Sequence, residues 1–142
     1  MIQFDSAKYL EVIKLVEKDG FEDLEAEKKI FEITHYEVGE AIAKLWKLPA
    51  EMTEVIGKHH FPSTSESYKE LVAVVRFADL LAEVWDAGFY EGLKILDLQS
   101  SEPWQILTSL IPDLTEMDLE AFTFELEQDF KNSILFLDLI SS

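Results

Sequence analysis

The sequence predicts an all-α fold, as one compact domain of about six helices spanning residues 1–142. Apolar residues recur at helical spacing along nearly the whole chain, and no segment alternates as a strand would. Apolar residues make up 48% of the 142 residues, too many for a disordered chain. A domain of this length typically buries about 68–70% of the surface that its unfolded chain exposes. The chain is therefore long enough to form one core.

The first three helices are delimited by capping signals. A first helix carries Tyr9, Ile13 and Val16 on one face, and Gly20 ends it. A second, strongly charged helix runs from about Asp23 to Ile33. A third starts at Thr34, because Thr34 and Glu37 have the spacing of a capping box. Its inward stripe should consist of Val38, Ala41, Ile42, Leu45 and Trp46.

Prolines organise the middle of the chain. Pro49 opens a fourth helix at a position where its missing N–H costs little, and this helix should stop near His60, because Phe61 precedes Pro62. Its inward residues would be Met52, Val55 and Ile56. After a polar loop at residues 62–67, a long helix from about Tyr68 to Asp86 follows. It carries on one face Leu71, Val74, Val75, Ala78, Leu81 and Trp85.

Two further helices complete the chain. Gly88 and Gly92 loosen the segment before them. A short helix begins near Ser101–Pro103 and is closed by Pro112. The final helix should start at Thr115, since Asp118 repeats the capping spacing. Its apolar residues are Leu119, Phe122, Leu126, Phe130, Leu137 and Ile140.

Composition excludes several functions. The net charge of −17, from 29 acids against 12 bases, argues against nucleic-acid and anionic-membrane partners. No apolar run approaches the ~20 residues that span a membrane, and the N-terminus has no signal-peptide pattern. The absence of cysteine excludes disulfides, thiolate metal sites and cysteine nucleophiles, and fits a cytoplasmic location.

All three histidines lie between Thr34 and Asp79. His35 and Asp79 each fall on an apolar helical stripe, so both should point inward. His59 and His60 are adjacent and would diverge by about 100° on a regular helix, so both can serve one centre only if the helix unwinds near Pro62. Three imidazoles and one carboxylate could fill a single tetrahedral or octahedral metal site.

Other interpretations of these polar residues stay open. Each could be a satisfied core residue, with Arg76 or a histidine as the partner of Asp79. The histidine pair could also cap the negative end of a helix. Four ligands are too few for a two-metal hydrolytic centre. There is no GxSxG motif or phosphate-binding glycine loop, and the acid pairs Glu25–Glu27 and Glu125–Glu127 are more typical of solvated helix faces.

Four segments form a combined signature over roughly residues 22–85: His35–Gly39, Leu45–Pro49, His59–Pro62 and Ala78–Asp79. Together they resemble the second half of an HDOD domain, the HD-related output domain of bacterial signalling proteins and a relative of the HD-GYP cyclic di-GMP phosphodiesterases. The resemblance implies an HD-like helical fold. In active relatives it also implies roles as ligands of a divalent metal such as Fe, Mn, Zn or Ni for His35, His59, His60 and Asp79.

The sequence departs from those active relatives in several ways. It has no adjacent His-Asp pair, no histidine before His35 and no GYP signature after the double histidine. We therefore expect a non-catalytic regulatory module that acts through protein contacts, with no catalytic residues and no cofactor beyond a possible divalent metal. One alternative is a metal-dependent phosphohydrolase of cyclic dinucleotides or nucleotides, with ligands completed by another chain. Another is a small structural interaction domain with a vestigial site.

Self-association is a further expectation. The family usually has a larger upstream helical half, here cut to about one helix and a turn. The run Ile134–Leu135–Phe136–Leu137 has apolar side chains on every side of its helix, more than one stripe can bury. We therefore expect a symmetric dimer, centred on the last helix or on the face beside the first.

Overall fold

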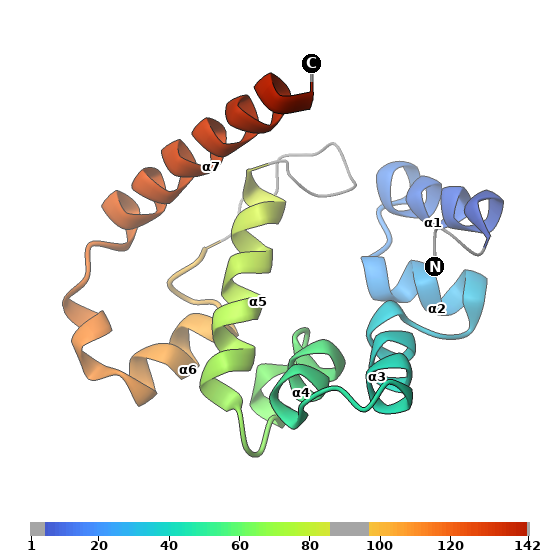
Figure 1. The fold of residues 1–142 in the computed structure, drawn as a ribbon, viewed down its shortest axis with the longest axis horizontal. Helices are drawn as coiled ribbons and strands as arrows, with labels where there is room; N and C mark the ends of the chain where they lie inside the picture. The colour runs from blue at the N-terminus through green and yellow to red at the C-terminus, as the bar shows by residue number, and fades with distance from the viewer. Residues whose placement is uncertain (1–4, 86–96, 142) are drawn as a thin grey trace.

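The computed structural model describes residues 5–85 and 97–141, with side chains up to residue 134. These residues form seven α-helices and two short 3₁₀ helices and contain no strand, which confirms the all-α prediction (Figure 1). The helices are α1 (Ser6–Asp19), α2 (Asp23–Phe31), α3 (His35–Leu45), α4 (Ala50–Lys58), α5 (Lys69–Val84), α6 (Glu102–Leu110) and α7 (Leu119–Ser141), with the 3₁₀ helices η1 (Pro62–Thr64) and η2 (Pro112–Glu116).

The helices pack mainly against their neighbours in sequence. Helix α1 packs on α2, α3 on α4, and α5 on both α4 and α6. In Figure 1 the α1–α2 pair lies at one side of α5, while α6 and α7 lie at the other. No helix in the described part of the chain is both long and apolar enough to cross a membrane.

Capping residues set the helix ends, largely as predicted. The Asp5 side chain accepts from the Lys8 N–H at 3.0 Å to start α1, and Gly20 ends it with a φ of 70°. The capping box at Thr34 is present: the Glu37 carboxylate accepts from the Thr34 N–H at 2.8 Å. Helix α2 ends at Phe31, two residues earlier than predicted, because Glu32 adopts a left-handed conformation.

The predicted start of the last helix at Thr115 is wrong. Thr115 lies in η2, and α7 begins at Leu119. The Asp118 carboxylate accepts from the Ala121 N–H at 3.0 Å, so Asp118 itself caps the helix. The prediction placed Asp118 in the first turn of the helix, whereas it is the residue that precedes the first turn. The short helix predicted between Ser101 and Pro112 is confirmed as α6.

The core lies where α5 meets α6 and the start of α7. The Phe77 and Trp104 rings lie 5.3 Å apart, and Trp85 stacks on Phe130 with ring centroids 5.6 Å apart. The buried members of this cluster are Ala73, Phe77, Leu81, Trp104, Leu107 and Leu119. This packing fixes α5, which carries Asp79 and Arg76, relative to the second half of the chain.

Several predicted inward residues are in fact exposed. On α3, Leu45 is 76% and Trp46 70% exposed, and Ala43 is buried instead. On α5, Leu71 and Val74 are exposed, and the buried set is Val72, Ala73, Phe77, Leu80 and Leu81. Since α5 is apolar on more than one face, periodicity alone did not decide which face the core covers. Other predicted inward residues that are exposed are Ala41, Met52 and Ala78.

Two glycines allow α3 and α4 to approach closely. A Cβ atom on Gly39 would lie 2.6 Å from Ile56 Cγ2, and one on Gly57 would lie 2.8 Å from Glu40 Cγ. Both distances are shorter than van der Waals contact, so only glycine fits without adjustment. The close approach brings the start of α3 beside the end of α4, where the histidines lie.

A candidate metal centre of three histidines

The structure brings the three histidines together. His35 is the first residue of α3, while His59 caps α4 and His60 lies in the turn that follows. The His35 Nε2 atom lies 3.2 Å from His59 Nε2 and 2.9 Å from His60 Nε2. One ligand atom from each of the three residues lies within 4.8 Å of the others. The helix therefore ends early enough for two adjacent imidazoles to face one centre.

Two of the imidazoles are oriented by oxygen atoms on their far side. His35 Nδ1 lies 2.9 Å from Glu27 Oε2, and His59 Nδ1 lies 3.0 Å from the Ile56 carbonyl oxygen. A carboxylate and a carbonyl can only accept, so the contacts assign a hydrogen to Nδ1 of both rings. The Nε2 atoms of His35 and His59 both face the common centre, and each presents a lone pair to it when its ring is neutral.

The surroundings keep two of the rings neutral. Burial, with smaller effects of His59 and Arg76, lowers the pKa of His60 to about 3. Burial followed by the neighbouring His35 lowers the pKa of His59 as well. Neutral imidazole is the form that binds metal ions. The Nε2 atoms of His35 and His59 lie 3.2 Å apart, close enough for one bound cation to contact both.

The two separations that involve His35 suit ligands of a single divalent ion. Metal–nitrogen bonds of about 2.0–2.1 Å at tetrahedral angles place neighbouring ligand nitrogens about 3.3 Å apart. The observed separations of 3.2 and 2.9 Å are close to this value. Three imidazoles leave a fourth position open, and His60 lines a cleft of about 450 Å³ between α2 and α5. Arg76, Glu22 and Glu83 also line this cleft.

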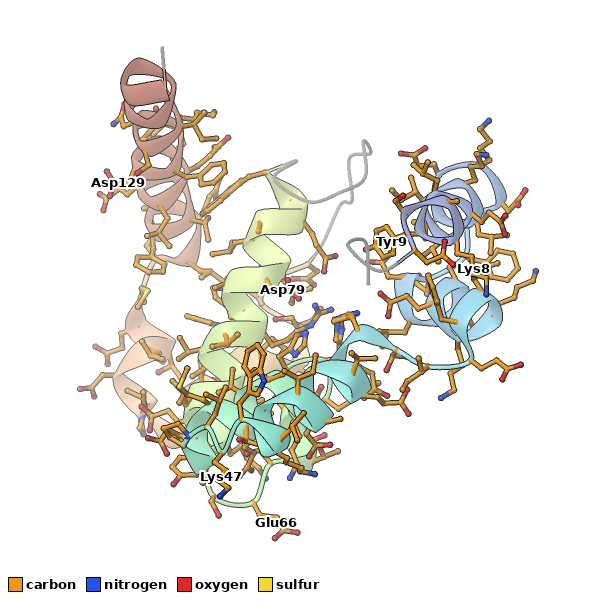
Figure 2. The ribbon with its side chains drawn as sticks, turned by 45° about the vertical axis from the view of Figure 1, so that its right-hand side comes forward. Lys8, Tyr9, Lys47, Glu66, Asp79 and Asp129 are labelled. Atoms are coloured by element: carbon orange, nitrogen blue, oxygen red, sulfur yellow. The ribbon has the colours of Figure 1, made fainter. Side chains whose placement is uncertain are left out.

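Asp79 does not join the three imidazoles as a neighbouring ligand. It forms an ion pair with Arg76, as anticipated from the sequence, and Arg76 also contacts Glu83 at 3.2 Å. The Asp79 side chain is 40% exposed and lies midway along α5 (Figure 2). Its charge is still near enough to oppose, in small part, the lowering of the pKa values of His59 and His60. A direct metal-ligand role for Asp79 stays a prediction.

Glu27 was missed by the sequence interpretation. It was assigned with Glu25 to a solvated helix face, yet it is only 2% exposed and its carboxylate contacts His35. A signal was present: Leu24, Ile30 and Phe31 share its helix face at spacings of three and four residues. A carboxylate inside an apolar stripe was recognised for Asp79, and the same criterion applied to α2 identifies Glu27.

Comparisons with known proteins agree with the sequence motifs. The HDOD domain family matches residues 1–62, a range that starts earlier than the signature at residues 22–85 and ends before Asp79. An uncharacterised protein of Treponema pallidum (strain Nichols) is 36% identical over 56 residues, which are 39% of this chain and 11% of that protein.

A solved structure shares the fold. The crystal structure of an HDOD domain protein of unknown function from Geobacter sulfurreducens superimposes with a TM-score of 0.67 and 26% sequence identity. The match covers 85% of this chain and 44% of that one, so the chain spans less than half the length of either relative. The family match and the shared helical fold confirm the resemblance to HDOD domains that the sequence motifs indicated.

Proposed function

We propose that the chain is a non-catalytic, HDOD-like regulatory module that acts through contacts with other proteins. In this proposal the three-histidine centre holds one divalent ion, which ties the start of α3 to the end of α4. The observation that carries it is the convergence of three Nε2 atoms, two of them with Nδ1 committed to an oxygen acceptor. A bound ion would supply coordinate bonds between two helix ends and leave one position for water.

The ligand set supports a structural rather than a hydrolytic role. A two-metal hydrolytic centre needs further carboxylates or histidines to hold and bridge the second ion. In the described part of the chain, His35, His59 and His60 are the one group of three or more such side chains close enough to share an ion. The nearby carboxylate of Asp79 is engaged by Arg76. These residues can hold one ion, so we propose no hydrolytic activity.

Exposed apolar side chains support a role in protein contacts. Leu45 and Trp46 project from the end of α3, and Met52 on α4 is also exposed. Burying such surface contributes about 25 cal/mol per Å² of apolar area, so these residues favour association over exposure to water. The proposed partners are proteins, and a dimer of this chain remains one form of that proposal.

A metal-dependent phosphohydrolase is the second candidate. The cleft beside His60 favours it, because Arg76 lines this cleft together with His60 and could attract a phosphate. Arg76 is already paired with Asp79 and Glu83, however, and the cleft carries further acidic side chains. An anionic substrate would have to displace these interactions, which favours the first proposal.

Elemental analysis and an activity assay separate the two candidates. The protein is purified without chelators or immobilised-metal chromatography, and metal content is measured per chain. We expect about one divalent ion per chain and no hydrolysis of cyclic dinucleotides after loading with Mn²⁺ or Fe²⁺. Metal-dependent hydrolysis that His59→Ala abolishes would establish the phosphohydrolase instead.

A further inference from the structure

We propose that Glu27 is a positioning residue for a divalent metal ion at the three-histidine centre. It would act through His35, by holding the imidazole with Nδ1 protonated and Nε2 directed at the ion. This inference rests on the metal binding proposed above and assigns a role to a residue on a different helix from the ligands.

The contacts of Glu27 are those of an orienting carboxylate. Its Oε2 atom accepts from the His35 backbone N–H at 2.8 Å and lies 2.9 Å from His35 Nδ1. One oxygen therefore fixes both the backbone and the ring of the same residue. The Glu27 side chain is 3% exposed, so water does not compete strongly for this oxygen. A buried carboxylate requires such donors, and His35 supplies two of them.

The charge of Glu27 distinguishes His35 from His59. The Nδ1 atom of His59 faces the neutral Ile56 carbonyl, whereas that of His35 faces a carboxylate. A carboxylate partner increases the basicity of the imidazole and fixes the ring tautomer, which strengthens metal binding at the opposite nitrogen. His35 Nε2 is also the atom that lies within 3.2 Å of both other Nε2 atoms. Through the His35 ring, Glu27 thus affects His35 Nε2, the nitrogen that lies near both of the other two.

A cobalt titration tests this role. Co²⁺ is added to metal-free wild type, Glu27→Gln and the control Glu25→Gln, and binding is followed by the visible d–d absorption of the ion. Glu25 is an exposed residue on the same helix that lines the cleft beside His60, so its substitution changes the charge near the centre but not the contact to His35. We expect Glu25→Gln to bind like wild type and Glu27→Gln to bind about 10–100-fold more weakly.

The amide variant separates positioning from simple packing. Glutamine keeps the shape of Glu27 and an oxygen acceptor, so a purely structural role predicts an unchanged Co²⁺ affinity. Equal affinities of wild type and Glu27→Gln would overturn the role of Glu27 while leaving the proposed metal site intact. A wild type that binds no Co²⁺ would overturn both the metal site and the inference drawn from it.

A measurement on the wild type covers the case in which Glu27→Gln does not fold. The ¹⁵N chemical shifts of the His35 ring report which nitrogen carries the hydrogen in the metal-free protein. We expect the Nδ1–H tautomer, because the Glu27 carboxylate accepts at that position. An Nε2–H tautomer, with Nδ1 unprotonated, would overturn the proposal.

Discussion

The Glu27 carboxylate on α2 and the His35 imidazole on α3 lie 2.9 Å apart, and this contact joins two parts of the fold. Helices α1 and α2 pack on each other, and Lys28 reaches Glu37 of α3 at 3.1 Å beside the Glu27–His35 contact. The Lys28–Glu37 pair is exposed and contributes little in water. The position of α2 therefore depends more on the part-buried Glu27–His35 contact, and through it on the histidine centre.

Metal binding should stabilise the fold and protect α2 from hydrogen exchange. A ligand at 100 times its dissociation constant adds about 2.7 kcal/mol to the free energy of unfolding. We expect Zn²⁺ to raise the melting temperature of metal-free protein and to slow exchange of amides in α2 and α3. His59→Ala should show neither effect. Equal shifts in wild type and His59→Ala would place the stabilising ion elsewhere.

Gly39→Ala should destabilise the protein although alanine favours helices. At an unobstructed helical position the change gains up to about 1 kcal/mol. Here the new Cβ would meet Ile56 Cγ2 at 2.6 Å, and overpacking of this kind typically costs about 1–3 kcal/mol. Urea denaturation measures the loss.

Gly57→Ala is the matched control for this substitution. Its new Cβ would meet the Glu40 side chain, which is partly exposed and can rotate away. We expect Gly57→Ala to cost clearly less than Gly39→Ala. If Gly39→Ala were neutral or stabilising, the close approach of α3 and α4 at Ile56 would be wrong.

Much of this fold could be predicted from the sequence because helix ends are local. Gly20 and the Thr34–Glu37 box act within a few residues of each helix end, and the structure confirms both. Which face of a helix is buried depends on its neighbours, so Trp46 was assigned inward and is exposed. Glu27 shows the same limit, since its partner His35 belongs to another helix. The convergence of the histidines was predictable from the sequence. The sequence offered either Arg76 or a histidine as the partner of Asp79, and the structure shows Arg76.

Asp79→Ala should cost only about 1 kcal/mol of unfolding free energy. The sequence suggested a few kcal/mol, on the assumption that a buried partner would be left without a counter-charge. In the structure Asp79 is 40% exposed, and Arg76 retains Glu83 at 3.2 Å after the substitution. Asp79→Asn should cost less, since its amide oxygen still accepts from Arg76. A loss above about 3 kcal/mol in denaturant melts would show that Asp79 supports the histidine centre directly.

Glu54 should make the stability of the loop after α4 depend on pH. Its carboxylate accepts from the Ser65 hydroxyl and from the Glu66 N–H at 2.9 Å, and the Ser65 contact is the main reason that its pKa is lowered from 4.5 to about 2. A lowered folded-state pKa stabilises the fold above the unfolded value, and this contribution is lost as pH falls from 4.5 toward 2.

Glu54→Gln tests this contribution. At neutral pH it should lower the melting temperature by roughly 3–5 °C, and the difference from wild type should shrink below pH 4.5. Glu51→Gln is the control, because Glu51 is exposed on the same helix. A difference between Glu54→Gln and wild type that stays constant down to pH 2 would show that the carboxylate charge is not the cause.

Self-association should depend on the end of α3 or on α7. The Phe136 side chain, which the sequence placed in a dimer contact, lies outside the described side chains, so exposed residues of the described part provide the test. Trp46 is 70% and Phe124 62% exposed, and a contact that buries either ring would be disrupted by a charge.

Light scattering over a range of micromolar concentrations measures the mass. We expect a mass above the 16.4 kDa of one chain that rises with concentration. Trp46→Glu should restore the single-chain mass if the α3 end forms the contact, and Phe124→Glu should do so if α7 forms it. Both substitutions remove exposed side chains, so circular dichroism should show unchanged helicity in each variant. A constant single-chain mass for the wild type would exclude the dimer, and the exposed Trp46 would then be a contact for a different protein.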